Sequence, residues 1–128
     1  MTQESTLHNR AVWFDIPVAD LDRADAFYAA VLACAVDRVS MPGMNFSVLE
    51  HDEGNGGCLV EKPNEIAADR GLLVYFNAEG RIRDAVAKAR EHGGVVVEDI
   101  HSIGPHGFRA IVLDSEGNRI ALHSMVDA

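Results

Sequence analysis

Residues 114–124 read Asp-Ser-Glu-Gly-Asn-Arg-Ile-Ala-Leu-His-Ser, and this stretch decides the fold. Gly117 and Asn118 supply the backbone freedom that a tight turn between two strands requires. The segment 119–124 after the turn is largely apolar and predicts a closing strand, and 108–113 before it predicts the strand that pairs with it. The sequence therefore predicts that the chain ends in a β-hairpin.

The first half of the chain begins with a pattern of period two, which predicts a strand over 11–17. A helix is expected to follow, with Asp20 as its N-cap and its end near Ala33, because apolar residues recur there at helical spacing. In the first strand, alternation predicts Val12, Phe14 and Ile16 on the helix side and Trp13 and Asp15 on the cleft side. Three further strands are predicted in this half, over 36–39, 46–50 and 58–61.

The second half repeats this order of elements. It predicts a strand over 72–76, a helix with an apolar stripe from Ile82 to Ala89 that stops at Gly93, and strands over 95–100, 108–113 and 119–124. One βαβββ half can hardly bury both its helix and its sheet faces alone, whereas two halves side by side can wrap their sheets around a shared cleft. The predicted fold class is α+β, with two βαβββ modules in one domain over residues 1–128.

Composition and charge limit the possible functions. The chain has 128 residues, 48 % of them hydrophobic, and a formal net charge of −9. This charge disfavours binding to nucleic acid or to an anionic membrane surface. The N-terminal segment is polar, and Cys34 and Cys58 form no spacing motif, so we expect a cytoplasmic protein with reduced thiols.

Three motifs in this order resemble the vicinal oxygen chelate superfamily, which includes glyoxalase I, bleomycin-binding proteins and extradiol dioxygenases. They are the helix start Val18-Ala19-Asp20-Leu21-Asp22-Arg23-Ala24, the pair Phe27-Tyr28, and the hairpin 114–122, in which Ser115 replaces the family's usual proline. The resemblance covers about residues 9–125. It implies a glyoxalase-like curved sheet, with module 1 over about 9–62 and module 2 over about 70–125.

The resemblance also implies where a metal would bind. Members that use a metal present His, Glu or Gln from the first, fourth, fifth and eighth strands. Those four positions fall here on Trp13, on Cys58 or Leu59, on Gly71 or Leu72, and on Ala121. Only Cys58 could coordinate, and one soft thiol does not make a site for a hard metal. We therefore expect neither a family-type metal nor another cofactor.

Two alternatives keep catalysis open. Asp15, Glu61 and His123 could converge into a rearranged metal site, which would suit a metal-dependent lyase, isomerase or dioxygenase. Asp15 and His123 could instead perform metal-free acid–base chemistry, if both lie in one pocket. Against both, a histidine near a strand end is more often a hydrogen-bonded wall residue, and Asp15 could equally make a structural hydrogen bond.

The function favoured by the sequence is metal-free binding of a small molecule. The residues expected to line the cleft are Trp13, Asp15, Tyr75, Phe108 or Arg109, and His123. The indole of Trp13 suits a planar or a cationic ligand, and the resemblance implies the same, since bleomycin-binding relatives bind cationic drugs without a metal. Trp13 could equally fill the space that a metal would otherwise occupy. His101 and His106 flank a Gly-Pro turn in a loop that could overhang the cleft, where histidines are usually solvated. The resemblance further implies a homodimer.

Overall fold

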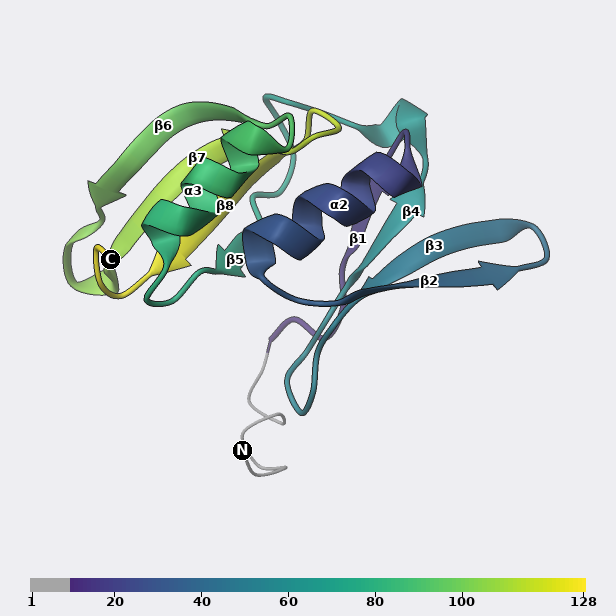
Figure 1. The fold of residues 1–128 in the computed structure, drawn as a ribbon, viewed down its shortest axis with the longest axis horizontal. Coiled ribbons are helices and arrows are strands. Elements are labelled where there is room, and N and C mark those ends of the chain that lie inside the picture. The colour runs from purple at the N-terminus through teal and green to yellow at the C-terminus, as the bar shows by residue number, and fades with distance from the viewer. Residues whose placement is uncertain (1–9) are drawn as a thin grey trace.

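The computed structural model describes residues 10–128, and it contains two βαβββ modules side by side (Figure 1). The first comprises β1 (Asp15–Val18), α2 (Leu21–Leu32), β2 (Val36–Met41), β3 (Met44–Leu49) and β4 (Cys58–Glu61). The second comprises β5 (Tyr75–Asn77), α3 (Ile82–Glu91), β6 (Val95–Ser102), β7 (Phe108–Leu113) and β8 (Arg119–Ser124). Two short 3₁₀ helices, η1 (Pro63–Glu65) and η2 (Gly104–His106), lie in the connections.

Each module is a four-stranded mixed sheet, in the order β1-β4-β3-β2 and β5-β8-β7-β6. The pairs β1/β4 and β5/β8 are parallel, and the other neighbours are antiparallel. The predicted α+β class with two βαβββ modules is confirmed. No helix within residues 10–128 combines the length and the apolar character that crossing a bilayer would require.

Two predicted strands begin later than their sequence patterns indicate. The first was expected from residue 11 but starts at Asp15, and the fifth was expected from residue 72 but starts at Tyr75. Val12 and Leu72 are 71 % and 92 % exposed, so the prediction that Val12 faces the helix is wrong. Each of these strands pairs in parallel with a strand that is distant in the sequence, and the β1/β4 ladder begins with the pair Asp15 and Cys58. The start of β1 is therefore set by where β4 begins, which the apolar pattern of β1 cannot show.

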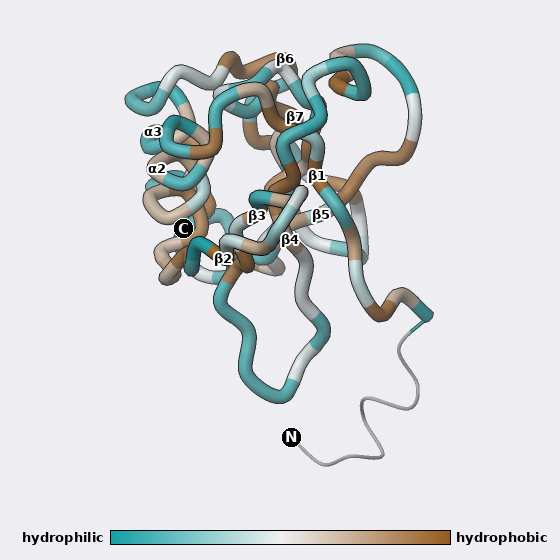
Figure 2. Tube along the Cα trace, turned by 90° about the vertical axis from the view of Figure 1, so that its right-hand side faces the viewer, coloured by the Kyte–Doolittle hydropathy of each residue, from teal (hydrophilic) through white to brown (hydrophobic). Residues whose placement is uncertain are grey.

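Both helices carry the apolar stripes that their periodicity predicts. The carboxylate of Asp20 accepts the N–H of Arg23 at 3.1 Å and caps α2, and Ala33 ends this helix in the left-handed conformation. The buried residues of the helices are Leu21, Ala24, Phe27, Tyr28 and Val31 in α2 and Ile82, Ala85, Val86 and Ala89 in α3. The helices contact each other, and Figure 2 shows them together on one side of the molecule.

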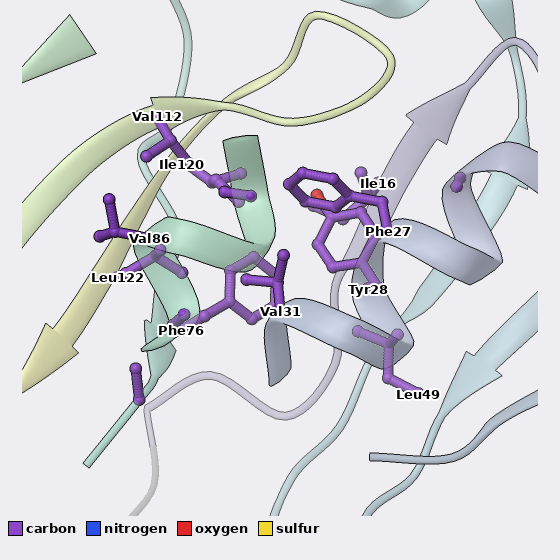
Figure 3. Close-up of a cluster of buried hydrophobic side chains, with 14 of the residues drawn as sticks. Ile16, Phe27, Tyr28, Val31, Leu49, Phe76, Val86, Val112, Ile120 and Leu122 are labelled. Atoms are coloured by element: carbon purple, nitrogen blue, oxygen red, sulfur yellow. The ribbon is translucent and has the colours of Figure 1, made fainter. Parts of the chain in front are cut away.

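One core serves both modules. The ring of Tyr28 from α2 lies between those of Phe27 and of Phe76 from β5, with centroids 5.0 and 5.5 Å away (Figure 3). Phe14 and Ile16 from the start of the chain, and Ile120 and Leu122 from its last strand, join the same cluster. Burying these side chains together is the main reason why neither module needs to be stable alone.

The turn 114–118 connects the two modules by hydrogen bonds. Glu116 Oε1 accepts the N–H groups of Ala19 and Asp20 at 3.0 and 2.9 Å, at the N-terminus of α2 in the other module. Arg23 Nε donates to Glu116 Oε2 at 2.7 Å. Asp114 is buried and accepts the phenol O–H of Tyr28 at 2.6 Å. The turn that closes the last hairpin therefore also holds the first helix in place.

Candidate functional site

The face of each sheet that points away from the helices is called its open face below. Alternation along the strands places Phe46, Val48 and Val60 on the first open face, in module 1. On the second open face, in module 2, it places Tyr75, Arg109, Ile111, Ala121 and His123. The first open face is mainly apolar, and the second carries polar side chains.

Arg109 is at the centre of a polar cluster on the second open face. Its Nε donates to Nε2 of His101 at 3.1 Å, and its Nη1 donates to the phenol oxygen of Tyr75. Nδ1 of His101 lies 2.8 Å from the carbonyl oxygen of Asp99, which can only accept a hydrogen bond. The proton of a neutral His101 is therefore on Nδ1, and Nε2 is the acceptor for Arg109. The chain of bonds fixes the guanidinium in one orientation.

His123 lies beside this cluster and is held by a backbone group. Its Nε2 lies 2.6 Å from the carbonyl oxygen of His106, so Nε2 carries a proton and Nδ1 of the neutral ring remains an acceptor. The ring stands edge-on to that of Tyr75, with 6.4 Å between the centroids. Together with Arg109 and Ile103, these residues line a pocket of about 440 Å³, which we call the Arg109 pocket.

The charge of Arg109 is not balanced by an ion pair. No carboxylate within residues 10–128 comes within salt-bridge distance of its guanidinium, and its partners Tyr75 and His101 are neutral acceptors. By contrast, Arg23, Arg38 and other arginines of the described chain each pair with an acidic side chain. The Arg109 pocket is therefore a locally cationic site in an acidic protein.

Trp13 and Asp15 lie in a different pocket, of about 520 Å³, which Arg70, Leu72 and Arg119 also line. The structure thus brings Tyr75, Arg109 and His123 together, and it separates them from the other two predicted cleft residues. Trp13 is 43 % exposed and stands edge-on to the ring of His51, with the centroids 5.6 Å apart. Its indole does not form the floor of the Arg109 pocket.

The sequence offered Phe108 or Arg109 as a residue that lines the cleft. Of the two, only Arg109 lines the Arg109 pocket. Consecutive residues of a strand point to opposite faces, and Phe108 shares the face of Ala110, which belongs to the helix-side core. The expectation for Phe108 is corrected by this alternation. Phe108 pairs with Ser102 and Ser124 in the sheet.

The four family metal positions do not fit a divalent metal. Cys58 is the one possible donor among them, and a single soft thiol, which donates a hydrogen bond to Asp15 at 3.1 Å, does not make a site for a hard metal. Trp13 and Ala121 offer no donor atoms. The position expected in the fifth strand, Gly71 or Leu72, lies before β5 and also carries no donor side chain.

The rearranged metal site is not formed either. Glu61 shares its strand face with Leu59 of the core, whereas Asp15 and His123 line two separate pockets. Within residues 10–128 there is no group of three or more His, Cys, Asp or Glu side chains that could hold a metal ion. The alternative in which these three residues converge on a metal is contradicted, and Asp15 and His123 do not line one pocket in which they could perform acid–base chemistry.

Sequence reasoning missed the roles of His101 and His106. The strand β6 continues to Ser102, two residues beyond its predicted end, so His101 lies in the sheet opposite Arg109. Irregular pairing between Val96 and His101 breaks the simple alternation, and only this irregularity aligns the two side chains. The carbonyl of His106, rather than its side chain, holds His123.

Comparisons with known proteins agree with this architecture. A family model described as bleomycin resistance protein-like N-terminal matches residues 10–50. A glyoxylase/bleomycin resistance protein/dioxygenase domain from Frankia sp. EAN1pec is 16 % identical with a TM-score of 0.71, and 91 % of each chain is covered. A glyoxalase/bleomycin resistance protein from Albidiferax ferrireducens T118 is 19 % identical with a TM-score of 0.70, covering 91 % of this chain and 98 % of its own.

A genomically encoded fosfomycin resistance protein, FosX, from Listeria monocytogenes is 12 % identical with a TM-score of 0.68, covering 91 % of this chain and 93 % of its own. No curated protein matches the chain. At these identities the solved structures show a shared fold, and they do not transfer an activity. Residues 10–50 thus resemble the N-terminal part of bleomycin resistance proteins, and the two βαβββ modules together have the fold of glyoxalase/bleomycin resistance proteins.

Proposed function

We propose that this chain is a small-molecule binding protein of the glyoxalase/bleomycin-resistance type that works without a metal, and that its ligand binds in the Arg109 pocket. The observation that carries the proposal is the fixed guanidinium of Arg109 in a pocket of about 440 Å³. Ligand sites commonly combine such a volume with apolar walls and a few oriented polar groups. Ile103 supplies an apolar wall here, and Tyr75 and His123 supply the polar groups.

Binding is favoured over catalysis by what the pocket contains. Arg109 and Tyr75 are hydrogen-bonded to each other and to His101, an arrangement that can hold and orient a ligand. No nucleophile with an adjacent base lines this pocket, whose side chains are those of Tyr75, Ile103, His106, Arg109 and His123. The thiols Cys34 and Cys58 are unpaired, which fits the reducing conditions of the cytoplasm, where we place the protein.

A melting scan against a panel of small aromatic molecules would test the binding function. A ligand present at 100 times its dissociation constant should stabilise the fold by about 2.7 kcal/mol and raise Tm by several degrees. The shift should shrink strongly in His123→Ala and persist in Trp13→Ala, because the two residues line separate pockets. The reverse pattern would place the ligand in the Trp13 pocket and contradict the proposed site.

The same scan with Ni²⁺, Zn²⁺, Mn²⁺ and Fe²⁺ tests the metal-free part of the proposal. We expect no comparable shift, because the family positions carry Trp13, a single soft thiol at Cys58, and Ala121. A stoichiometric metal with a shift of several degrees would contradict this part while leaving the organic ligand to be tested separately.

We also propose a homodimer that covers the first open face. Met41 and Met44 are 53 % and 52 % exposed at the end of this face, next to Phe46, Val48 and Val60. Such an apolar patch is stabilised when a partner covers it, and a second copy of the chain is the partner that the superfamily resemblance implies.

Light scattering should give twice the monomer mass, and Met44→Glu should lower the measured mass toward that of the monomer. A monomeric wild-type protein at micromolar concentration would overturn the dimer.

A further inference from the structure

We propose that the Arg109 pocket selects small organic oxyanions, carboxylates in particular, over neutral and cationic molecules of the same shape. This inference rests on the proposed binding function and adds the chemical class of the ligand. It follows from the hydrogen-bond state of four side chains in and beside the pocket: Tyr75, His101, Arg109 and His123.

Arg109 retains donors for a ligand. A guanidinium has five N–H groups, and in the described chain one of them binds His101 and one binds Tyr75. Both terminal nitrogens therefore keep N–H groups that can form the two parallel bonds typical of arginine with a carboxylate. Since His101 is itself anchored to the carbonyl of Asp99, the guanidinium is oriented before a ligand arrives.

Tyr75 adds a second donor at the same place. Its phenol oxygen already accepts a hydrogen bond from Arg109, so its own O–H is directed elsewhere and can donate to an anion. Tyr75 is about half exposed and lines the pocket, which gives a ligand access to it. Arg109 and Tyr75 together provide donors on one side of the pocket, an arrangement that stabilises negative charge.

The remaining side chains that line the pocket carry no negative charge. Ile103 is apolar, and Nε2 of His123 is occupied by the carbonyl of His106. None of the residues that line the pocket is acidic. A ligand cation close to the guanidinium would instead be repelled by its positive charge. The cationic ligand that Trp13 suggested is thus disfavoured in this pocket.

The test uses three probes that share a phenyl ring and have similar size, benzoate, benzamide and benzylammonium, titrated into the full chain by NMR. We expect benzoate to bind at least tenfold more tightly than either of the others, with shifts at Arg109 Nε–H and at the rings of His101 and His123. Acetate and inorganic phosphate should compete with benzoate, and their relative strength distinguishes a carboxylate preference from general anion binding.

Substitutions of Arg109 and Tyr75 separate the effect of the positive charge on benzoate affinity from the effect of hydrogen-bond geometry. Arg109→Gln should abolish the preference for benzoate over benzamide, and Arg109→Lys should restore only part of it because an ammonium lacks the planar fork. Tyr75→Phe should weaken benzoate several-fold. Arg70→Gln is the matched control, since it removes the same charge from the rim of the Trp13 pocket and should leave benzoate affinity unchanged.

The outcomes distinguish the two proposals. If benzamide or benzylammonium binds in the pocket as tightly as benzoate, the anion inference falls and the binding function stands. The anion inference also falls if the benzoate preference survives Arg109→Gln in a variant whose circular dichroism is unchanged. If millimolar benzoate, acetate and phosphate all leave the NMR signals of Arg109 and His123 unchanged, the anion inference is overturned. The melting scan against small aromatic molecules then tests the binding function separately.

Discussion

Replacing Asp114 by alanine should lower the free energy of unfolding by about 3–5 kcal/mol, a large share of the total stability of a domain of this size. The buried carboxylate accepts four hydrogen bonds, from the Tyr28 phenol, the Asn118 side chain and the backbone N–H groups of Glu116 and Asn118. Alanine would leave the fully buried phenol of Tyr28 without its partner. Unsatisfied buried polar groups of this kind are among the costliest single changes.

Urea unfolding would measure the effect, with Tyr28→Phe as the matched control. That variant removes one of the four bonds without leaving a donor unpaired, so it should cost about 1 kcal/mol. The double variant Tyr28→Phe/Asp114→Ala should be more stable than the sum of the single changes predicts, because the phenol is no longer orphaned. A loss below about 1 kcal/mol for Asp114→Ala would show that the turn is not needed to hold α2 in place.

Acidification should destabilise the protein through Glu116. Burial alone would raise the pKa of this carboxyl, but hydrogen bonds from Arg23, Ser115 and the N–H groups of Asp20 and Ala19 outweigh it and lower the pKa from 4.5 to about 2. A depressed folded-state pKa means that the ionised form is bound better in the native state. Its stabilisation is therefore fully present above about pH 4.5 and is lost as the pH falls toward 2.

The size of this loss is about 2–3 kcal/mol, since each pKa unit corresponds to about 1.4 kcal/mol and Arg23 at the other end of the pair is half exposed. Unfolding curves measured from about pH 6 down to about pH 3 should show the decline. Glu116→Gln should be less stable than the wild type at neutral pH and should show a flatter decline. Parallel curves for the two proteins would assign the acid sensitivity to other carboxylates.

Much of the fold could be predicted from the sequence because the deciding signals are local. The strands 108–113 and 119–124 begin and end where their patterns indicate, since Gly117, at φ 97°, takes the positive angle that the turn between them requires. The helix stripe from Ile82 to Ala89 is buried as its spacing predicts. The starts of β1 and β5 could not be predicted, because parallel pairing joins segments that are far apart in the sequence.

The sequence by itself determined the order of the elements, the face of each residue in the last strand, and the chemistry missing from the metal positions. A period of two is enough to put Ala121 on the face opposite Ile120 and Leu122, and alanine has no donor atom wherever it lies. Only the tertiary structure decided that Trp13 and Arg109 belong to separate pockets. Tyr75 in β5 and Arg109 in β7 are 34 residues apart, and they meet because both strands pair with β8, which lies between them. Such long-range pairing is set by burial of the shared core rather than by any local pattern.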